Sequence, residues 1–186
     1  LQLLKAQIHP HFFFNTLNAL YGLALEKSEH TPASILRLSE VMNFVLYEAK
    51  TKDVPLQREM EIIEDYIALE KLRYGERVQV AINKSGALAE WSIPGLLLLP
   101  FVENAFKHSR TVLNEKIKID FDLHMENDWI VFTSVNNFYQ QEKDRHSGIG
   151  LENVRKRLTH LYPEQHTIET NTSNNIYNTT IRIKAR

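Results

Sequence analysis

Residues 3–20, LLKAQIHPHFFFNTLNAL, decide how the rest of the chain is interpreted. The segment has the composition of a helix except at Pro10, because proline lacks an N–H and its ring crowds the carbonyl four residues earlier. The sequence therefore predicts either a helix bent at Pro10 or a new helix that starts with this proline. His11 follows directly after the break.

One side of this predicted helix is polar. At about 3.6 residues per turn, the same side carries a histidine and three amides: Gln7, His11, Asn15 and Asn18. His9 lies about 200° away around the helix, so it cannot share that face. Two interpretations remain open at this point. The histidine is either an exposed member of a polar stripe or an imidazole nucleophile for a phosphoryl group.

Composition limits the possible functions. The 186 residues, 43% of them hydrophobic, suffice for one large or two small domains. A net charge of −1 gives no sign of direct binding to nucleic acid or to an anionic membrane. The chain has no cysteine, which excludes disulfides, thiol catalysis and cysteine zinc sites. Because it opens at Leu1 inside a predicted helix, we expect a piece of a longer protein, preceded by segments such as a membrane sensor.

Residues 1–74 are predicted to be helical. Helices are expected from residue 1 to about 27, from about 31 to 49 with Thr31 as N-cap, and from 56 to 73. The second helix carries an apolar stripe: Ile35, Leu38, Met42, Val45 and Leu46. One hairpin has too little surface to bury such stripes, so we expect a dimer whose four-helix bundle uses residues 1–50 of both chains.

The pattern changes after residue 75, and residues 75–186 are predicted to form a second domain. Alternating apolar residues predict strands at 78–82, 117–123, 129–135, 168–170 and 176–183, with turns at 126–128 and 171–175. Helices are expected at 94–108 and 150–161. Strands paired in hairpins and covered by helices describe a two-layer α/β sandwich, so the whole chain is predicted to be α+β.

Three motifs of this half suggest chemistry. The helix at 94–108 ends in a polar cluster: Glu103, Asn104, Lys107 and His108. A side-chain oxygen there can ligate Mg²⁺ and a cation suits phosphate, although a solvated helix end explains any one of these residues. The GIGL sequence at 148–151 can bring backbone N–H groups to phosphate or be a plain turn. Residues 138–147, after a strand that ends in Asn136 and Asn137, are placed to act as a lid.

Taken in order, these motifs resemble those of sensor histidine kinases, in the subgroup related to autolysin-regulating sensors. The phosphoacceptor motif of that subgroup is close to QINPHFLFNTLN, and residues 7–18 read QIHPHFFFNTLN. The resemblance continues through YIALEKLRY at 66–74, VENAFKH at 102–108 and GIGLENVRKRL at 148–158. It extends over essentially the whole chain, and the ordered set is much more specific than any single motif.

The resemblance implies a helical dimerisation and phosphoacceptor region, residues 1–74, joined to a Bergerat-type ATP-binding domain, residues 75–186. It implies that His11 is the phosphoacceptor, that Glu103 is a second catalytic residue and that Asn104 is the Mg²⁺ ligand. ATP and Mg²⁺ are the implied cofactors. Further nucleotide contacts are implied for these residues: Lys107, His108, Asn137, Gly148, Gly150 and Leu151.

The sequence departs from ordinary histidine kinases at the adenine box, D-x-G-x-G, which is missing. Asn137 stands where the aspartate would fall, followed by Phe138 and Tyr139 instead of glycines. Because Asn137 ends an alternating strand, we expect its side chain to face the cavity between sheet and helices and to accept a hydrogen bond from adenine. Asn136 is the next candidate if that expectation fails.

The expected function is ATP-dependent autophosphorylation on His11 in a cytoplasmic homodimer, then transfer to an aspartate of a response regulator. By resemblance, that regulator is a DNA-binding transcription factor, and the full-length protein is a bacterial inner-membrane sensor held by segments outside this sequence. Two alternatives stay open. One is a weakly active or inactive dimeric signalling scaffold, and the other is a metal-dependent hydrolase that uses His9, His11 and His108.

Overall fold

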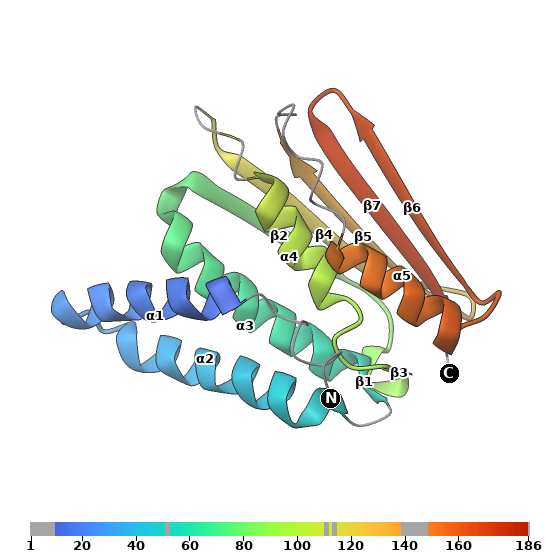
Figure 1. The fold of residues 1–186 in the computed structure, drawn as a ribbon, viewed down its shortest axis with the longest axis horizontal. Helices are drawn as coiled ribbons and strands as arrows, with labels where there is room; N and C mark the ends of the chain where they lie inside the picture. Colours follow the sequence, from blue (N-terminus) through green and yellow to red (C-terminus); the bar gives the residue numbers. More distant parts are fainter. Residues whose placement is uncertain (1–9, 51–52, 110–111, 113–114, 139–148, 186) are drawn as a thin grey trace.

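A computed structural model describes the chain except for residues 1–9, 51–52, 110–111, 113–114, 139–148 and 186 (Figure 1). Its α-helices are α1 (Pro10–Leu25), α2 (Thr31–Leu46), α3 (Leu56–Tyr74), α4 (Leu99–His108) and α5 (Ile149–Leu161). The strands are β1 (Val54–Pro55), β2 (Val78–Lys84), β3 (Ser92–Ile93), β4 (Ile117–Glu126), β5 (Trp129–Asn137), β6 (His166–Ser173) and β7 (Ile176–Lys184). Helices α1 to α3 form one part of the molecule, and a sheet covered by α4 and α5 forms the other (Figure 1).

Helices α1 and α2 form the predicted hairpin, and both pack against α3 (Figure 1). Pro10 is helical and is the first described residue of α1, so the choice between a bend at Pro10 and a new helix lies outside the described residues. The prediction that Thr31 caps α2 is wrong, because Thr31 is already helical and His30 occupies the N-cap without a side-chain capping bond. Instead, the Ser34 hydroxyl donates to the His30 carbonyl oxygen at 2.9 Å.

The apolar stripe of α2 divides between two environments. Leu38 is buried together with Val41 and Phe44, whereas Ile35 and Met42 remain 54% and 41% exposed. The stripe is therefore only partly buried within one chain, in line with the expectation that one hairpin has too little surface to bury it. The buried members face the core with α1 and α3, and the others form a second apolar face on the outside of the hairpin.

The main sheet has five strands in the order β2-β4-β5-β7-β6, with β2 parallel to β4 and the other neighbours antiparallel. Alternation puts Ile119, Phe121 and Leu123 of β4 on the side that faces the helices. The predicted strands and both hairpins are confirmed, although β6 and β7 are longer than expected. Their turn narrows to Asn174 and Asn175, which adopt positive φ angles of 51° and 59°.

The prediction that a helix begins at residue 94 is wrong. Strand β3 pairs with β1 up to Ile93, and residues 94–98 then form a turn before α4 begins at Leu99. Within this turn Leu96 has a φ of +59°, which no helix permits. A Cβ on Gly95 would lie 2.8 Å from the Cα of Ala49, so only glycine allows this approach to the helical region.

One hydrophobic core joins the two predicted domains. It includes Phe44 and Ile63 from the helical region together with Phe101, Phe106 and Phe121 from the sandwich. The short β1–β3 pairing also links residues from both sides of the predicted boundary at 74/75. Within the described part of the chain, no helix has the length and apolar character needed to cross a membrane.

Candidate functional site

His11 lies in the first turn of α1 with its side chain exposed. The amide nitrogen of Asn15 is 2.9 Å from His11 Nδ1, one helical turn away, as the predicted polar stripe requires. This contact orients the imidazole ring. Gln7 and His9, the remaining residues of the predicted motif, lie outside the described residues.

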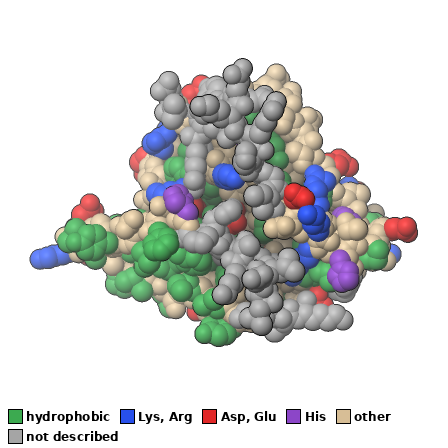
Figure 2. Space-filling view, viewed as in Figure 1, with side chains coloured by type: hydrophobic (Ala, Val, Ile, Leu, Met, Phe, Trp, Pro, Cys, Tyr) green, Lys and Arg blue, Asp and Glu red, His purple; other side chains and the backbone are tan. Residues whose placement is uncertain are grey.

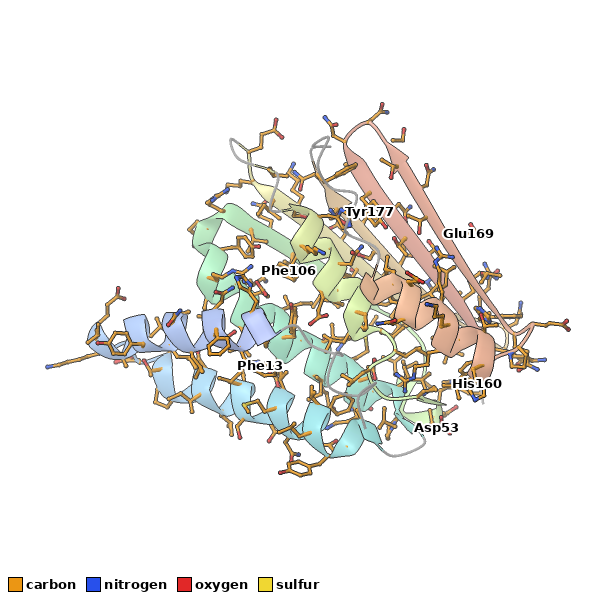
Figure 3. All side chains as sticks on the ribbon, in the orientation of Figure 1. Phe13, Asp53, Phe106, His160, Glu169 and Tyr177 are labelled. Carbon is orange, nitrogen blue, oxygen red and sulfur yellow. The ribbon has the colours of Figure 1, made fainter. Side chains whose placement is uncertain are left out.

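A column of aromatic rings connects the start of α1 with α4. Phe12, next to His11, stacks on Tyr66 of α3 with ring centroids 4.3 Å apart. Tyr66 meets Phe106 of α4 edge to face at 6.2 Å, and Phe106 in turn stacks on Tyr74. Phe13 of α1 and Phe106 are labelled in Figure 3. The helix that bears His11 and the helix that bears Asn104 are thus packed through α3.

Charged side chains surround this column. The hydroxyl of Tyr66 donates to Glu70 Oε1 at 3.2 Å, and Glu70 pairs with Arg73 at 2.8 Å. Burial raises the pKa of Tyr66 well above its usual value, and the negative charges of Glu70 and Glu103 act in the same direction. Glu103 of α4 is therefore close enough to Tyr66 of α3 for its charge to act on the hydroxyl, a proximity that sequence reasoning did not predict.

The polar residues predicted at the end of α4 do not share one environment. Asn104 is buried, with 9% of its surface exposed, Lys107 is exposed, and His108 is intermediate. Lys107 and His108 occupy the last turn, where positive charge complements the helix dipole. Gly148 lies outside the described residues, whereas Gly150 falls in the first turn of α5 and Leu151 is buried there.

Asn136, rather than Asn137, faces the helices. The Asn136 side-chain nitrogen donates to Ser109 Oγ at 3.2 Å, and that hydroxyl donates to the carbonyl oxygen of Asn137 at 3.1 Å. Asn136 is only 1% exposed, and its Oδ1 has no hydrogen-bond partner among the described residues. Ser109 thereby holds the amide so that its oxygen is left as an available acceptor.

The prediction that Asn137 faces the cavity is wrong. Its Oδ1 accepts a hydrogen bond from the backbone N–H of Lys118 at 2.8 Å, and its Nδ2 donates to the carbonyl oxygen of Lys116 at 2.9 Å. Successive side chains of a strand point to opposite faces, and Ser134 and Asn136 already occupy the buried face of β5. The same alternation, counted from Ile130, would have identified Asn136 from the sequence.

A second buried polar atom without a partner among the described residues lies near Asn136. It is Thr179 Oγ1 on β7, a residue 3% exposed that sequence reasoning missed. Asn136 pairs with Tyr177 and Ser134 pairs with Thr179, so Asn136 and Thr179 are diagonal neighbours on the helix-facing side. Diagonal neighbours have Cβ atoms about 7–8 Å apart, a gap that the polar edge of one heterocycle can bridge.

Aromatic side chains border these two atoms. The ring of His108 stacks on Tyr177 with centroids 4.6 Å apart and an interplanar angle of 11°, and Phe138 meets both rings edge to face. Tyr177, labelled in Figure 3, comes from β7 and was not singled out in the sequence. The arrangement combines flat apolar surfaces with an available acceptor and a hydroxyl, which is the chemistry that a purine base requires.

The described residues contain no group of three or more His, Cys, Asp or Glu side chains close enough to hold a metal ion. Within them, His11 on α1 and His108 at the end of α4 do not belong to such a cluster. Asn104 remains the side chain with a suitable oxygen on the helix beside the aromatic cluster.

Comparison with known proteins gives a family model and relatives that resemble this chain. A family model described as Histidine kinase matches residues 1–78. The Sensor protein LytS of Staphylococcus haemolyticus is 30% identical over 172 residues, which cover 86% of this chain and 30% of that protein. The chain therefore spans about 30% of the length of this relative.

Solved structures of low sequence identity share the fold. The histidine kinase domain of the Erythrobacter litoralis blue-light activated kinase EL346 matches with a TM-score of 0.55 and 12% identity, covering 97% of this chain and 90% of that one. The histidine kinase ThkA in complex with the response regulator TrrA matches with a TM-score of 0.51 and 13% identity, covering 95% and 59%.

Proposed function

We propose that this chain, which has the sequence and fold of a sensor histidine kinase core of the LytS-like group, binds ATP and transfers its γ-phosphoryl group to His11. The observation that carries the proposal is the pair of buried polar atoms, Asn136 Oδ1 and Thr179 Oγ1, which have no partner among the described residues. An unsatisfied buried group costs about 1–3 kcal/mol, so a ligand that pairs both atoms recovers that cost.

Adenine has the matching pattern of donors and acceptors. Its exocyclic amino group can donate to Asn136 Oδ1, and its ring nitrogen N1 can accept from the Thr179 hydroxyl. Guanine carries a carbonyl oxygen in place of the amino group, so the contact with Asn136 Oδ1 would be lost, whereas the Thr179 hydroxyl can also accept from guanine N1–H. The rings of His108 and Tyr177 supply apolar surface next to the two atoms. The site therefore favours ATP over GTP.

The phosphates are expected toward α4 and the start of α5. When bound, Mg²⁺ neutralises phosphate charge, and the side-chain oxygen of Asn104 is the ligand that α4 offers it. Lys107 can pair with phosphate oxygens. The GIGL sequence, with Gly148, Gly150 and Leu151, is proposed to admit the phosphates to the N-terminal end of α5.

In the proposed reaction an imidazole nitrogen of His11 attacks the γ-phosphorus of ATP. A P–N bond forms, the bond to the bridging oxygen breaks, and ADP leaves. Asn15 keeps the ring in position, which reduces the freedom lost on reaching the reactive geometry. The proton released from the ring needs an acceptor, and we assign Glu103 to this role because its charge acts on Tyr66, which stacks on Phe12 beside His11.

A second copy of the chain is the proposed cover for the outer face of the α1–α2 hairpin. Figure 2 shows hydrophobic side chains gathered over these two helices. Large apolar residues exposed there are Phe14, Leu17, Tyr21, Leu25, Ile35, Leu36, Met42, Leu46 and Tyr47. A face of this kind on adjacent helices suits a four-helix bundle. Sedimentation as a monomer at roughly tens of micromolar would contradict the proposal.

The phosphoryl group is proposed to pass from His11 to an aspartate of a response regulator. The ThkA structure, which contains a response regulator, supports this class of partner. We further propose that the chain is the cytoplasmic part of a bacterial membrane sensor and that its regulator is a DNA-binding transcription factor.

Incubation with γ-labelled ATP and Mg²⁺ tests the function. We expect an acid-labile, base-stable label on the protein, because phosphohistidine has that stability. A protein that binds ATP without becoming labelled would instead be a signalling scaffold. Phosphate release that does not depend on His11 would indicate a hydrolase.

A further inference from the structure

Helix α4 begins without a capping residue of its own. It is preceded by Leu96, Leu97 and Leu98, and the N-cap residue Leu98 makes no side-chain capping bond. The first N–H groups of a helix have no partner within the helix and need acceptors from elsewhere. Here this turn is fully buried, so water cannot supply them.

Glu59 of α3 provides these acceptors. Its Oε1 accepts the N–H of Leu98 at 2.7 Å and its Oε2 accepts the N–H of Leu96 at 2.7 Å. The carboxylate is completely buried and lies 39 residues before Leu98 in the chain. A negative charge at this position also complements the positive end of the α4 dipole. The start of α4 is therefore held by a different helix.

Arg157 of α5 holds the same turn from its carbonyl side. Its Nη1 donates to the carbonyl oxygen of Gly95 at 2.7 Å. Burial lowers the pKa of Arg157, and the charge of Glu59 acts in the opposite direction. The charge of Asp53 acts in the same direction as that of Glu59. Two charged side chains, one from α3 and one from α5, thus hold residues 95–98 by hydrogen bonds to the backbone.

The turn between them has an unfavourable backbone. Leu96 has a φ of +59°, a conformation that side chains other than glycine rarely adopt. Gly95 next to it is pressed against Ala49. Such conformations persist only where the surroundings determine them strongly, and they are concentrated at functional sites. Burial of a charged carboxylate such as that of Glu59 is also costly compared with apolar packing, which favours a role in fixing one arrangement.

We infer that Glu59 and Arg157 are positioning residues that fix α4, and with it Asn104 and Lys107, relative to the helix that carries His11. The inference rests on the proposed function. Helix α3 supports it, because Glu59 binds the start of α4 and Tyr66, two turns later on the same helix, stacks on Phe12 beside His11. Arg157 adds α5, whose first turn follows the proposed phosphate loop.

The test separates nucleotide binding from phosphoryl transfer. In Glu59→Gln, an amide NH₂ group replaces one carboxylate oxygen. This donor faces one of the two backbone N–H groups, so one of the two hydrogen bonds that hold the turn is lost. We expect the dissociation constant of a fluorescent ATP analogue to stay within about threefold of the parent. The rate of His11 labelling at saturating ATP should fall by about tenfold to a hundredfold, because an error near 1 Å has that effect.

Glu64→Gln is the matched control, since Glu64 lies on the same helix and pairs with Lys84 at the surface. We expect its dissociation constant for the ATP analogue and its rate of His11 labelling to equal those of the parent. Arg157→Lys provides a second variant, with Arg155→Lys, at an exposed site on the same helix, as its control. Lysine keeps the positive charge but lacks the guanidinium fork, so we expect the same separation of rate from affinity.

Each outcome decides the matter. A selective loss of labelling rate in Glu59→Gln or Arg157→Lys, with the controls unchanged, supports the inference. Parental rates in both variants overturn it and leave the proposed function intact. Parallel loss of affinity and rate, or failure of both variants to fold while their controls fold, shows a purely structural role and also overturns it. A parent that never becomes labelled overturns the proposed function and this inference together.

Discussion

The two ends of α4 differ in how their polar groups are satisfied. At the start of α4, the backbone N–H groups of Leu96 and Leu98 donate to Glu59, and the carbonyl oxygen of Gly95 accepts from Arg157. At the other end, Asn136 Oδ1 and Thr179 Oγ1 lie buried without a partner among the described residues. The comparison teaches that satisfied buried charges mark the place where a helix is fixed, and unsatisfied polar atoms mark the place where a ligand is expected.

The largest expected effect comes from removing the side chain that accepts the backbone N–H groups at the start of α4. Glu59→Leu leaves the N–H groups of Leu96 and Leu98 without acceptors and removes a negative charge that acts on the partly buried Arg157. We expect a loss of about 3–5 kcal/mol in the free energy of unfolding, measured by urea denaturation. Glu61→Leu, an exposed site on the same helix, should change it by no more than about 0.5 kcal/mol. A loss below about 1 kcal/mol for Glu59→Leu would contradict the described hydrogen bonds.

The next largest effect concerns ATP affinity and the side-chain oxygen of Asn136, which lies near the other end of α4 and is unpaired among the described residues. Asn136→Leu removes the acceptor proposed for the adenine amino group and should weaken ATP binding about tenfold or more. Asn136→Asp retains an acceptor oxygen and should be tolerated better. Asn137→Leu is the matched control, because that side chain bonds the backbone of residues 116 and 118 on the other face. Titration calorimetry with ATP and GTP is the measurement, and equal affinity of the parent for both nucleotides would show that adenine is not recognised.

A pH titration sharpens the comparison at Glu59. Burial raises the pKa of Glu59 to about 7, while the N–H groups of Leu98, Leu96 and Leu99 and then the Arg157 charge act against it. Because the folded pKa lies above the unfolded value of 4.5, the folded protein binds the proton more tightly, and stability rises as pH falls through 7 toward 4.5.

Relative to Glu59→Gln, the parent should therefore gain about 1 kcal/mol in unfolding free energy between pH 7 and pH 6. Other groups near the pair, Tyr162 and Asp53, are present in both proteins and cancel in the difference. Denaturation curves at several pH values provide the measurement. Parallel pH profiles for the two proteins would show that Glu59 does not titrate in this range.

The smallest expected effect is a change at Thr179 that leaves the stability of the free protein unchanged or higher and lowers its affinity for ATP. Thr179→Val replaces a buried hydroxyl that lacks a partner among the described residues by a methyl group of similar size. The free protein should be unchanged or more stable by up to about 1 kcal/mol, whereas ATP affinity should fall about fivefold. Thermal unfolding with and without ATP measures both. A destabilised free protein with normal ATP affinity would mean that the hydroxyl has a structural partner.

The sequence predicted most of the fold because its strands alternate clearly and Pro32 marks the start of a helix. It could not predict the start of α4, because LLLLP carries no capping signal and the acceptor comes from Glu59, far away in the chain. A helix extended back to residue 94 was the natural interpretation of an apolar run, and the tertiary contact overrode it.

The candidate site was predicted in outline. Residues on α4 could be identified because four polar side chains interrupt an apolar helix. The asparagine that faces the helices was misassigned by one position, as Asn137 instead of Asn136, and in a strand one position reverses the face. Thr179 could not be found at all, because β7 contains adjacent threonines and only the observed register shows which one faces the helices. The roles of all these residues remain predictions.

The most direct test of the central claim compares the two neighbouring histidines. In the parent, incubation with γ-labelled ATP and Mg²⁺ should produce an acid-labile label that mass spectrometry locates on His11. His11→Gln should abolish the label, and His9→Asn, which introduces the residue usual in the resembling family, should leave it largely intact. Loss of the label in His9→Asn with retention in His11→Gln would contradict the account, because the reactive face of α1 would then be the opposite one.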